Sequence, residues 1–304
     1  MQQSKTILFF GNERLATGVV TKLPVLNGLV LEGYHVAAIV LPGKHTKPER
    51  LEVLDFAAKH HIPILYLAST SLQELASYHA PLAVLASFGS LVRQAVIDLF
   101  PRGIVNIHPS LLPKHRGPIP IESVILHNEP STGVSLMRLS AKMDSGPLYG
   151  QTYLTLKGHE TKQALADSLD QLGADLLLHE LPDILSGKLK PKAQPLTGFS
   201  YDQRLNSQSG LLDFTLPAKV LERQVRAYAG WPKSRFSIQH IQLIVTAAHV
   251  IPKHPTYAGQ ISSDKQQLCI DTLQDTLCID RLIPAGSKEM SGAEFIRGYG
   301  KLLT

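Results

Sequence analysis

Short apolar segments alternate with segments of helical pattern from residue 6 to about residue 187. The apolar segments are residues 6–10, 35–41, 62–67, 82–87 and 103–108. The intervening segments carry apolar residues at helical spacing, over residues 14–23, 48–61, 71–79 and 90–100. Strands that are apolar along nearly their whole length occur in parallel sheets with helices on both faces. The alternation therefore predicts an α/β fold with a doubly wound, mostly parallel sheet.

The segments after residue 130 predict how this sheet ends and where a second domain starts. Residues 132–139 and 146–156 are strand-like with little between them, which indicates a pair of strands at the sheet edge. A long helix is expected from Thr161 to about Ser186. Residues 188–206 are rich in Pro, Gly and Ser and have no clear period, as in a linker. We therefore expect a first domain over residues 1–187 and a second over residues 207–304.

The second domain has a different pattern, in which one amphipathic helix precedes several short strands. The helix is expected over residues 217–230, and the strands follow at residues 234–238, 241–251, 259–263, 267–272 and 276–283. Ser291 and Glu294 form a capping-box pattern for a last helix. Short strands separated by turn residues predict a small C-terminal β-barrel, which we expect to be OB-like.

The composition excludes several classes of protein. An apolar content of 44% with 18% charged residues is typical of a globular chain and not of a disordered one. No apolar run approaches the roughly 20 residues that a membrane span needs. The strand-like run from residue 6 leaves no room for a signal peptide, so we expect a cytoplasmic protein without membrane association. The net charge of +5 and pI near 9.1 permit a polyanionic partner without requiring one.

The two cysteines, Cys269 and Cys278, lie nine residues apart in the β-rich region. So few sulfur ligands do not favour a disulfide scaffold or a thiolate metal site. We expect both residues to be reduced and to act as small apolar strand residues. No cluster of His, Cys and Asp has the spacing of metal ligands, so we expect no metal.

Asn106 and His108 stand at the end of an expected core strand. A strand has a side-chain period of two, so both side chains lie on one face. Ligands of open α/β sheets bind beyond the carboxyl ends of the strands. An amide can donate to a developing oxyanion, and an imidazole can exchange a proton near neutral pH. The alternative is a pair of hydrogen-bonded polar residues that only terminate the strand.

Asp144 lies in a Ser-Gly-Pro turn after the strand-like residues 132–139. A carboxylate there can cap its own turn, which is the commonest role of Asp in turns. It can also reach back to orient the His108 imidazole and stabilise its charge. Together the three side chains would form a site that handles protons and stabilises an oxyanion.

At this point the sequence resembles a known family. "NIHPSLLPKHRG" and "TGVSLMRLSAKMDSGPLYGQ" resemble the formyltransferase catalytic domain that uses 10-formyltetrahydrofolate. "FFGNERLA" and "LASFGSLVRQAVIDLFPRGIVNIH" resemble its first strand and its folate-pocket strand and helix. "LLDFTLPAKVLERQVRAYAGWPKSRF" and "RLIPAGSKEMSGAEFIRGY" resemble the C-terminal part of the methionyl-tRNA formyltransferase family. The resemblance thus covers nearly the whole chain.

This resemblance implies roles for individual residues. Asn106 would hold the formyl oxygen as it becomes negative. His108 would stabilise that oxyanion or shuttle a proton, and Asp144 would take the proton of the amine. The pocket for the folate donor, 10-formyltetrahydrofolate, would be lined by two residues upstream of the strand at residues 103–108 and by four residues of the loop after it. These are Phe88, Gly89, Ser110, Leu111, Leu112 and Pro113. No metal is implied.

The implied acceptor is initiator methionyl-tRNA, and we expect a monomer. The C-terminal basic residues that would contact tRNA are Arg223, Arg226, Lys233 and Arg235. Lys44 and Lys47 lie in a loop that is shorter than the Arg- and Gly-rich loop of methionyl-tRNA enzymes. For each basic residue the alternative is a solvated charge or, on the helix, a charge outside a packed aromatic face.

The sequence also bears on three other functions, of which a sugar-nucleotide formyltransferase is the nearest rival. A sugar-nucleotide formyltransferase would use the same donor and the same three residues, and "AGWPKSRF" and "IPAGSKEMSGAEFIRGY" argue against it. "NIHPSLLPKH" also resembles glycinamide ribonucleotide formyltransferases, which lack a C-terminal domain. A folate- or RNA-binding module without catalysis would not need Asn106, His108 and Asp144 together.

Overall fold

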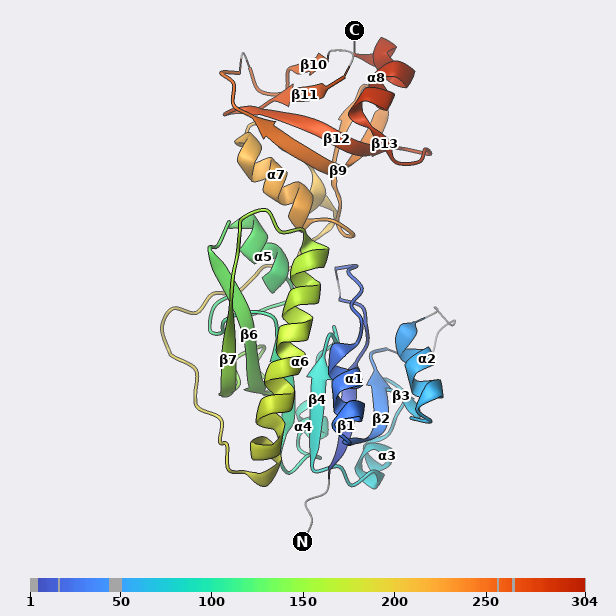
Figure 1. The fold of residues 1–304 in the computed structure, drawn as a ribbon, viewed down its shortest axis with the longest axis vertical. Coiled ribbons are helices and arrows are strands. Elements are labelled where there is room, and N and C mark those ends of the chain that lie inside the picture. The colour runs from blue at the N-terminus through green and yellow to red at the C-terminus, as the bar shows by residue number, and fades with distance from the viewer. Residues whose placement is uncertain (1–4, 16, 44–50, 256, 264–265, 304) are drawn as a thin grey trace. The chain divides into compact units, whose positions relative to one another are not determined.

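The computed structural model describes residues 5–15, 17–43, 51–255, 257–263 and 266–303 (Figure 1). Two compact units make up the chain. Unit 1 comprises Met1–Ile121, Pro130–Leu156 and Gln163–Arg204. Unit 2 comprises Glu122–Glu129, Lys157–Lys162 and Leu205–Thr304. Among the described residues no helix is both long enough and apolar enough to cross a bilayer.

A seven-stranded sheet forms the centre of unit 1, in the order β3-β2-β1-β4-β5-β6-β7. Its first five strands in that order are parallel, and β6 and β7 run antiparallel at one edge. The strands are β1 (Thr6–Gly11), β2 (His35–Leu41), β3 (Ile64–Tyr66), β4 (Leu82–Ala86), β5 (Ile104–His108), β6 (Ser131–Arg138) and β7 (Leu148–Thr155). The α/β prediction is confirmed, and so is the paired excursion at the sheet edge.

Helices cover both faces of this sheet. They are α1 (Pro24–Leu31), α2 (Glu52–Lys59), α3 (Leu72–Ser77), α4 (Gln94–Ile97) and α6 (Lys162–Ser186). The helix α5 (Pro120–Leu126) follows β5 in the chain, and most of it belongs to unit 2. On one face, α6 packs so closely that a Cβ on its Gly173 would lie 2.6 Å from Ile107. The opposite face contributes Leu8 and Phe10 to a buried cluster with side chains of α3 and α4. Period two along β1 divides its side chains between these layers.

The prediction of a helix over residues 14–23 is wrong. The chain turns there instead, because Thr21 N–H donates to Glu13 O at 2.7 Å and Gly18 has a φ of 85°. The helix α1 begins one residue later, at Pro24, which suits a first helical turn. Glycine and β-branched residues are poor helix formers, and they outweigh the apolar spacing of this segment.

Glu13 links this turn to α2. Its buried carboxylate accepts from the backbone N–H of Glu52 at 2.9 Å and of Val53 at 3.3 Å. The negative charge and the acceptor oxygens both suit a helix N-terminus. Before residues 44–50, Gly43 O accepts a hydrogen bond from Ala68 N–H at 3.1 Å. Lys44 and Lys47 lie between these anchors, outside the described residues.

The segment that the sequence predicts as a linker runs along unit 1. Lys192 exchanges two backbone hydrogen bonds with Leu148, at 2.7 and 2.8 Å, and so extends the edge at β7. Further on, Tyr201 forms a parallel bridge with Arg116 in the loop after β5. Residues 188–204 are therefore bonded to the sheet edge and to that loop.

Unit 2 contains a curled antiparallel sheet that forms half of a barrel. Its order is β10-β11-β12-β9-β8, and β13 pairs with β12. The strands are β8 (Ser234–Ile238), β9 (Ile241–Ile251), β10 (Ile261–Ser263), β11 (Leu268–Asp271), β12 (Thr276–Pro284) and β13 (Met290–Ser291). The helices are η1 (Ser207–Gly210), α7 (Ala218–Ala227), α8 (Gly292–Tyr299) and η2 (Gly300–Leu302). The small C-terminal β-structure and the Ser291–Glu294 capping box are confirmed.

The core of unit 2 lies between this sheet and α7. Leu221 and Val225 of α7 join Phe236, Leu243 and Leu277 of the strands in one buried cluster. Their spacing of four along the helix places both α7 residues on the same face. The helix thus packs against one face of this sheet.

Cys269 and Cys278 form a disulfide, so the expectation of two reduced cysteines is wrong. The register of β11 and β12 places the two residues directly opposite each other. A spacing of nine in the sequence becomes a facing pair because the hairpin closes between Asp271 and Thr276. Cysteine count alone carried no information on this register.

Candidate active site

Asn106 and His108 lie on β5, between β4 and β6. Asn106 pairs with Leu85 of β4 and Met137 of β6, and His108 pairs with Ser135. Both side chains are buried, with 7% and 5% of their surfaces exposed. β5 is the last parallel strand before the antiparallel edge, and its carboxyl end carries both residues.

The His108 imidazole is held from two sides. Nε2 lies 3.0 Å from His115 O, and because a carbonyl only accepts, this bond assigns a proton to Nε2. Nδ1 lies 3.8 Å from Asp144 Oδ1, which is an ion-pair distance and not a hydrogen bond. The structure therefore brings His108 and Asp144 together, 36 residues apart in the chain.

Asp144 is presented by a tight turn after β6. It adopts a φ of 46°, and its Oδ2 accepts from Gly117 N–H at 2.8 Å. Gly117 has a φ of 121°, a conformation that favours glycine. The turn lies close against β6, because a Cβ on Gly146 would lie 1.9 Å from Arg138 O. The side chain of Asp144 is 14% exposed, so part of it remains accessible.

The Asn106 carboxamide differs from the other two groups. Within the described part of the chain, no hydrogen bond joins it to another residue. Buried polar groups are nearly always hydrogen-bonded, since leaving one unpaired is unfavourable. A buried amide whose two N–H donors are left to other molecules suits a carbonyl oxygen of a ligand.

The candidate folate residues divide into two groups. Phe88, Ser110 and Leu112 are buried: the Phe88 ring packs edge-on against Phe10 at 5.6 Å, and Ser110 Oγ donates to Lys114 O at 2.8 Å. Their side chains support the wall of a site from within. The residues with accessible surface are Gly89, Leu111 and Pro113.

Ser135 and Gln151 hold the loop that contains these residues, and the sequence gave no reason to single them out. Ser135 Oγ accepts from Leu112 N–H at 3.0 Å and donates to Ser110 O at 2.6 Å. Gln151 Nε2 lies 2.8 Å from both Leu112 O and Ser135 Oγ. The loop is thus fixed by side chains of β6 and β7. In the sequence, only the alternation of side chains along the two expected strands could have indicated which face Ser135 and Gln151 occupy.

Arg116 and Gln194 are further polar residues that the sequence analysis missed. Both are 7% exposed. Arg116 Nη2 donates to Gln194 Oε1 at 2.6 Å, and Gln194 Nε2 donates to Asp144 O at 2.9 Å. Arg116 lies within the motif "NIHPSLLPKHRG", whereas Gln194 lies in a segment without any pattern.

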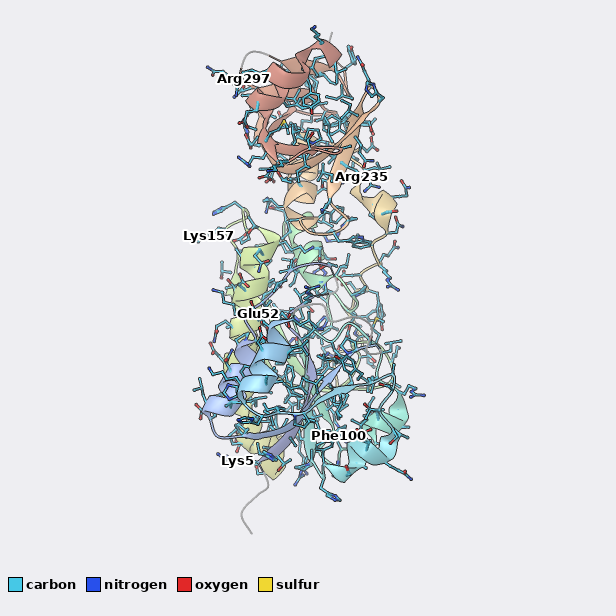
Figure 2. All side chains as sticks on the ribbon, turned by 90° about the vertical axis from the view of Figure 1, so that its right-hand side faces the viewer. Lys5, Glu52, Phe100, Lys157, Arg235 and Arg297 are labelled. Carbon is cyan, nitrogen blue, oxygen red and sulfur yellow. A yellow bond between two sulfur atoms is a disulfide. The ribbon has the colours of Figure 1, made fainter. Side chains whose placement is uncertain are left out.

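The candidate tRNA-binding residues of unit 2 differ in how far their charges are engaged. Arg223 Nε donates to Leu126 O at 3.0 Å. Arg226 is paired with Glu222 at 2.6 Å, and Arg235, which Figure 2 labels, donates to Ser207 O at 2.6 Å. Lys233 is exposed. Of the four, Lys233 therefore offers the most accessible charge.

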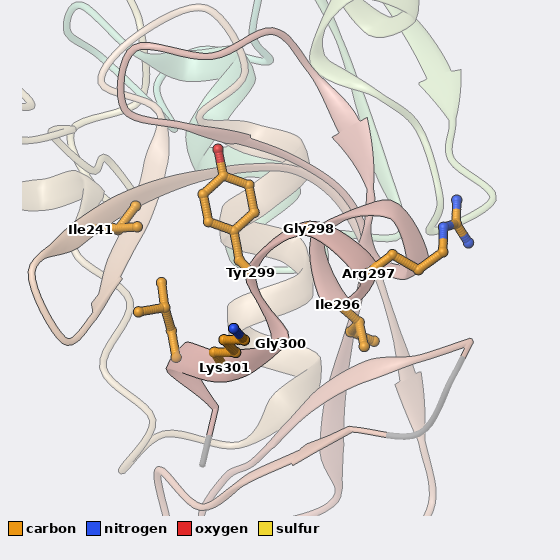
Figure 3. A pocket seen from close by; sticks show the side chains of 8 residues that line it. Ile241, Ile296, Arg297, Gly298, Tyr299, Gly300 and Lys301 are labelled. Atoms are coloured by element: carbon orange, nitrogen blue, oxygen red, sulfur yellow. The ribbon is translucent and has the colours of Figure 1, made fainter.

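A cavity of about 650 Å³ opens on unit 2, beside α8 and η2 (Figure 3). Its lining combines apolar side chains with two cations: Ile241, Ile296, Arg297, Gly298, Tyr299, Gly300, Lys301 and Leu302. None of the candidate catalytic or folate residues lines it. Among the described residues, no group of three or more His, Cys, Asp or Glu side chains could hold a metal ion.

Comparison with known proteins finds formyltransferases over both units. Residues 50–181 match the family described as formyl transferase, and residues 204–300 match formyl transferase, C-terminal domain. The methionyl-tRNA formyltransferase of Chloroflexus aurantiacus is 31% identical over 96% of this chain and 96% of that protein.

Solved structures share the fold. The sugar 3N-formyl transferase WlaRD, crystallised with dTDP and 5-N-formyl-THF, has a TM-score of 0.69 at 18% identity, over 93% of this chain and 98% of that chain. The methionyl-tRNA formyltransferase from Clostridium thermocellum has a TM-score of 0.54 at 12% identity, over 88% and 96%. At such identities the likeness concerns the fold alone.

Proposed function

The chain belongs to the methionyl-tRNA formyltransferase family, and on that premise we propose that it formylates the α-amino group of initiator methionyl-tRNA. The donor in this proposal is 10-formyltetrahydrofolate, and the place is the cytoplasm, where charged tRNA is used for translation initiation. The observation that carries the reaction is the buried Asn106 carboxamide, which no described residue hydrogen-bonds, two residues from His108.

Asn106 acts on the oxygen of the formyl group. When the amine nitrogen forms its bond to the formyl carbon, the carbonyl electrons move to that oxygen. The carboxamide N–H groups donate to the oxyanion, and their buried position strengthens the bond relative to water. No metal is needed for this step in the proposal.

His108 and Asp144 act on protons and charge. The attacking amine gains positive charge and must lose a proton, which Asp144 accepts. His108 is oriented by the bond from its Nε2–H to His115 O, which leaves Nδ1 beside Asp144 to exchange a proton, and the imidazolium so formed stabilises the oxyanion by its charge. Collapse of the tetrahedral intermediate then breaks the bond from the formyl carbon to the folate nitrogen, which takes up the proton that Asp144 accepted from the amine.

The donor site is proposed at the loop after β5. Leu111, Pro113 and Gly89 have accessible surface, whereas Phe88, Ser110 and Leu112 fix the wall behind them. Apolar walls with a few fixed polar groups are typical of small-molecule sites.

Label transfer from radioactive 10-formyltetrahydrofolate tests the function. Initiator methionyl-tRNA and a dTDP-linked amino sugar are offered in separate reactions, since the fold is shared with a sugar enzyme. We expect label on the tRNA and background counts on the sugar. Label on the sugar alone would replace the acceptor in the proposal, and label on neither would reject formyl transfer to both.

A second experiment tests the tRNA surface proposed for unit 2. Lys233→Ala should weaken tRNA binding and reduce the slope of log affinity against log salt by roughly 0.7 to 0.9, as for one lost phosphate contact. Arg226→Ala is the matched variant: its guanidinium is already paired with Glu222, so we expect the wild-type salt slope. Filter binding over a salt series measures both slopes. An unchanged slope in Lys233→Ala would remove this residue from the tRNA surface.

A further inference from the structure

Residues 194–202, called the strap below, are bonded to the loop after β5. Arg116 N–H donates to Ser200 O at 3.0 Å, and Asp202 N–H donates to Arg116 O at 2.7 Å. His115 N–H donates to Ser200 Oγ at 2.8 Å, and its Nδ1 lies 3.2 Å from Asp202 Oδ1. The strap therefore fixes the backbone of residues 115 and 116 on both sides.

This backbone holds the two proton-handling side chains of the site. His115 O accepts from His108 Nε2, and Gly117 N–H donates to Asp144 Oδ2. Residues 115–117 thus set the orientation of the imidazole and of the carboxylate at once. A shift of this short stretch would change the distance between His108 and Asp144.

Gln194 closes the network from the other end of the strap. Its Oε1 accepts from Nε and Nη2 of Arg116, at 3.2 and 2.6 Å. Its Nε2 donates to Asp144 O at 2.9 Å and to Gly146 O at 2.7 Å. One buried carboxamide therefore joins the loop after β5 to the turn that presents Asp144.

We infer that Gln194 is a positioning residue, which sets the geometry of Asp144 for the formyl transfer proposed above. It touches none of the candidate catalytic side chains and acts through the backbone of the Asp144 turn. The inference rests on the proposed function for its kinetic effect, but its structural effect can be measured without any substrate.

Gln194→Glu tests this role while it preserves the partner of Arg116. The carboxylate still accepts from the guanidinium, but it loses both N–H donors and faces two carbonyl oxygens. We expect kcat to fall about tenfold, the size of one net hydrogen bond, with KM for both substrates unchanged. Gln194→Ala, which also leaves the buried Arg116 without this partner, should lose stability in addition.

A double-mutant cycle separates positioning from a general loss of structure. If Gln194 acts through Asp144, then Gln194→Glu should lower the residual rate of Asp144→Asn by less than about twofold, since coupled residues are not additive. A full tenfold effect in the Asp144→Asn background would overturn the inference. The matched control is Gln203→Ala. Gln203 is an exposed glutamine directly after the strap, so this variant should keep the wild-type kcat.

Hydrogen exchange at the Gly117 amide gives the readout that needs no activity. This N–H donates to Asp144 Oδ2, so displacement of the turn in Gln194→Glu should speed its exchange, while Gln203→Ala should not. Wild-type exchange in Gln194→Glu would overturn the inference even in an active enzyme. Faster exchange, in a protein that formylates neither acceptor, would support the strap and reject the proposed function.

Discussion

Asn106→Ala is expected to lower kcat for formyl transfer by about 100- to 1,000-fold, the usual effect of removing one oxyanion donor. The carboxamide is 7% exposed, and among the described residues it has no hydrogen-bond partner to lose. Its removal should therefore leave the fold intact and act on the transition state. KM for the folate donor should change little, because the ground-state carbonyl oxygen carries less charge. Single-turnover kinetics with initiator methionyl-tRNA measure this effect.

Asn27→Ala is a matched control for this variant. Asn27 is an exposed residue of α1 in the same unit, and its amide donates to Lys22 O and Leu23 O. Loss of those bonds should lower stability slightly and leave kcat unchanged. A folded Asn106→Ala protein with near-normal kcat would show that the oxyanion is stabilised elsewhere.

Lys162→Met should lower the free energy of unfolding of unit 2 by about 3–5 kcal/mol, as expected when one partner of a buried ion pair is removed. Lys162 is fully buried, and its Nζ lies 3.1 Å from Glu122 Oε1, whose side chain is 3% exposed. The same ammonium donates to Ala229 O at 2.7 Å. Burial lowers the pKa of Lys162, and the Glu122 carboxylate opposes that lowering.

Urea denaturation followed by tryptophan fluorescence measures this loss, since Trp231 is the single tryptophan of the chain and lies in unit 2. Lys219→Met removes an exposed lysine of the same unit and should stay within about 0.5 kcal/mol of wild type. In the double variant Glu122→Leu/Lys162→Met, most of the stability should return, because no charge remains buried. If Lys162→Met unfolds at the wild-type urea concentration, the ammonium does not compensate Glu122.

The sheet of unit 1 could be predicted because its central strands are buried on both faces. Such strands consist of uninterrupted runs of apolar residues, which can be recognised in the sequence. β5 is an example: five consecutive residues from Ile104 to His108 are buried. The helix expected over residues 14–23 failed because the same apolar content is used in a turn. Its closing bond, from Thr21 to Glu13, has no sequence periodicity.

The site was predictable only in part. Strand period placed Asn106 and His108 together, and turn chemistry marked Asp144. Gln194 could not be found, because it reaches Asp144 across 50 residues from a segment with no regular pattern. A linear sequence shows the residue types of such a network but not their pairing.

The basic residues of unit 2 also show that the sequence gives residue types but not their pairing. The sequence places Arg223, Arg226, Lys233 and Arg235 in one region and so predicts a charged surface. In the structure Arg226 is neutralised by Glu222, four residues away on the same helix. The sequence gives the net charge of this region. How many of its cations are free to bind a polyanion depends on ion pairs within the protein, such as the pair of Arg226 with Glu222.

Glu13 fixes the first turn of α2 from 39 residues earlier in the chain, and Ala68 fixes Gly43 on the other side of residues 44–50. The chain is therefore anchored before and after this stretch by partners that lie outside it. Loop-closure entropy grows only with the logarithm of length, so doubling such a loop costs about 0.6 kcal/mol. Insertions between Gly43 and Leu51 are thus nearly neutral for folding. A longer stretch between Gly43 and Leu51 is therefore expected to leave both anchors and the sheet of unit 1 unchanged.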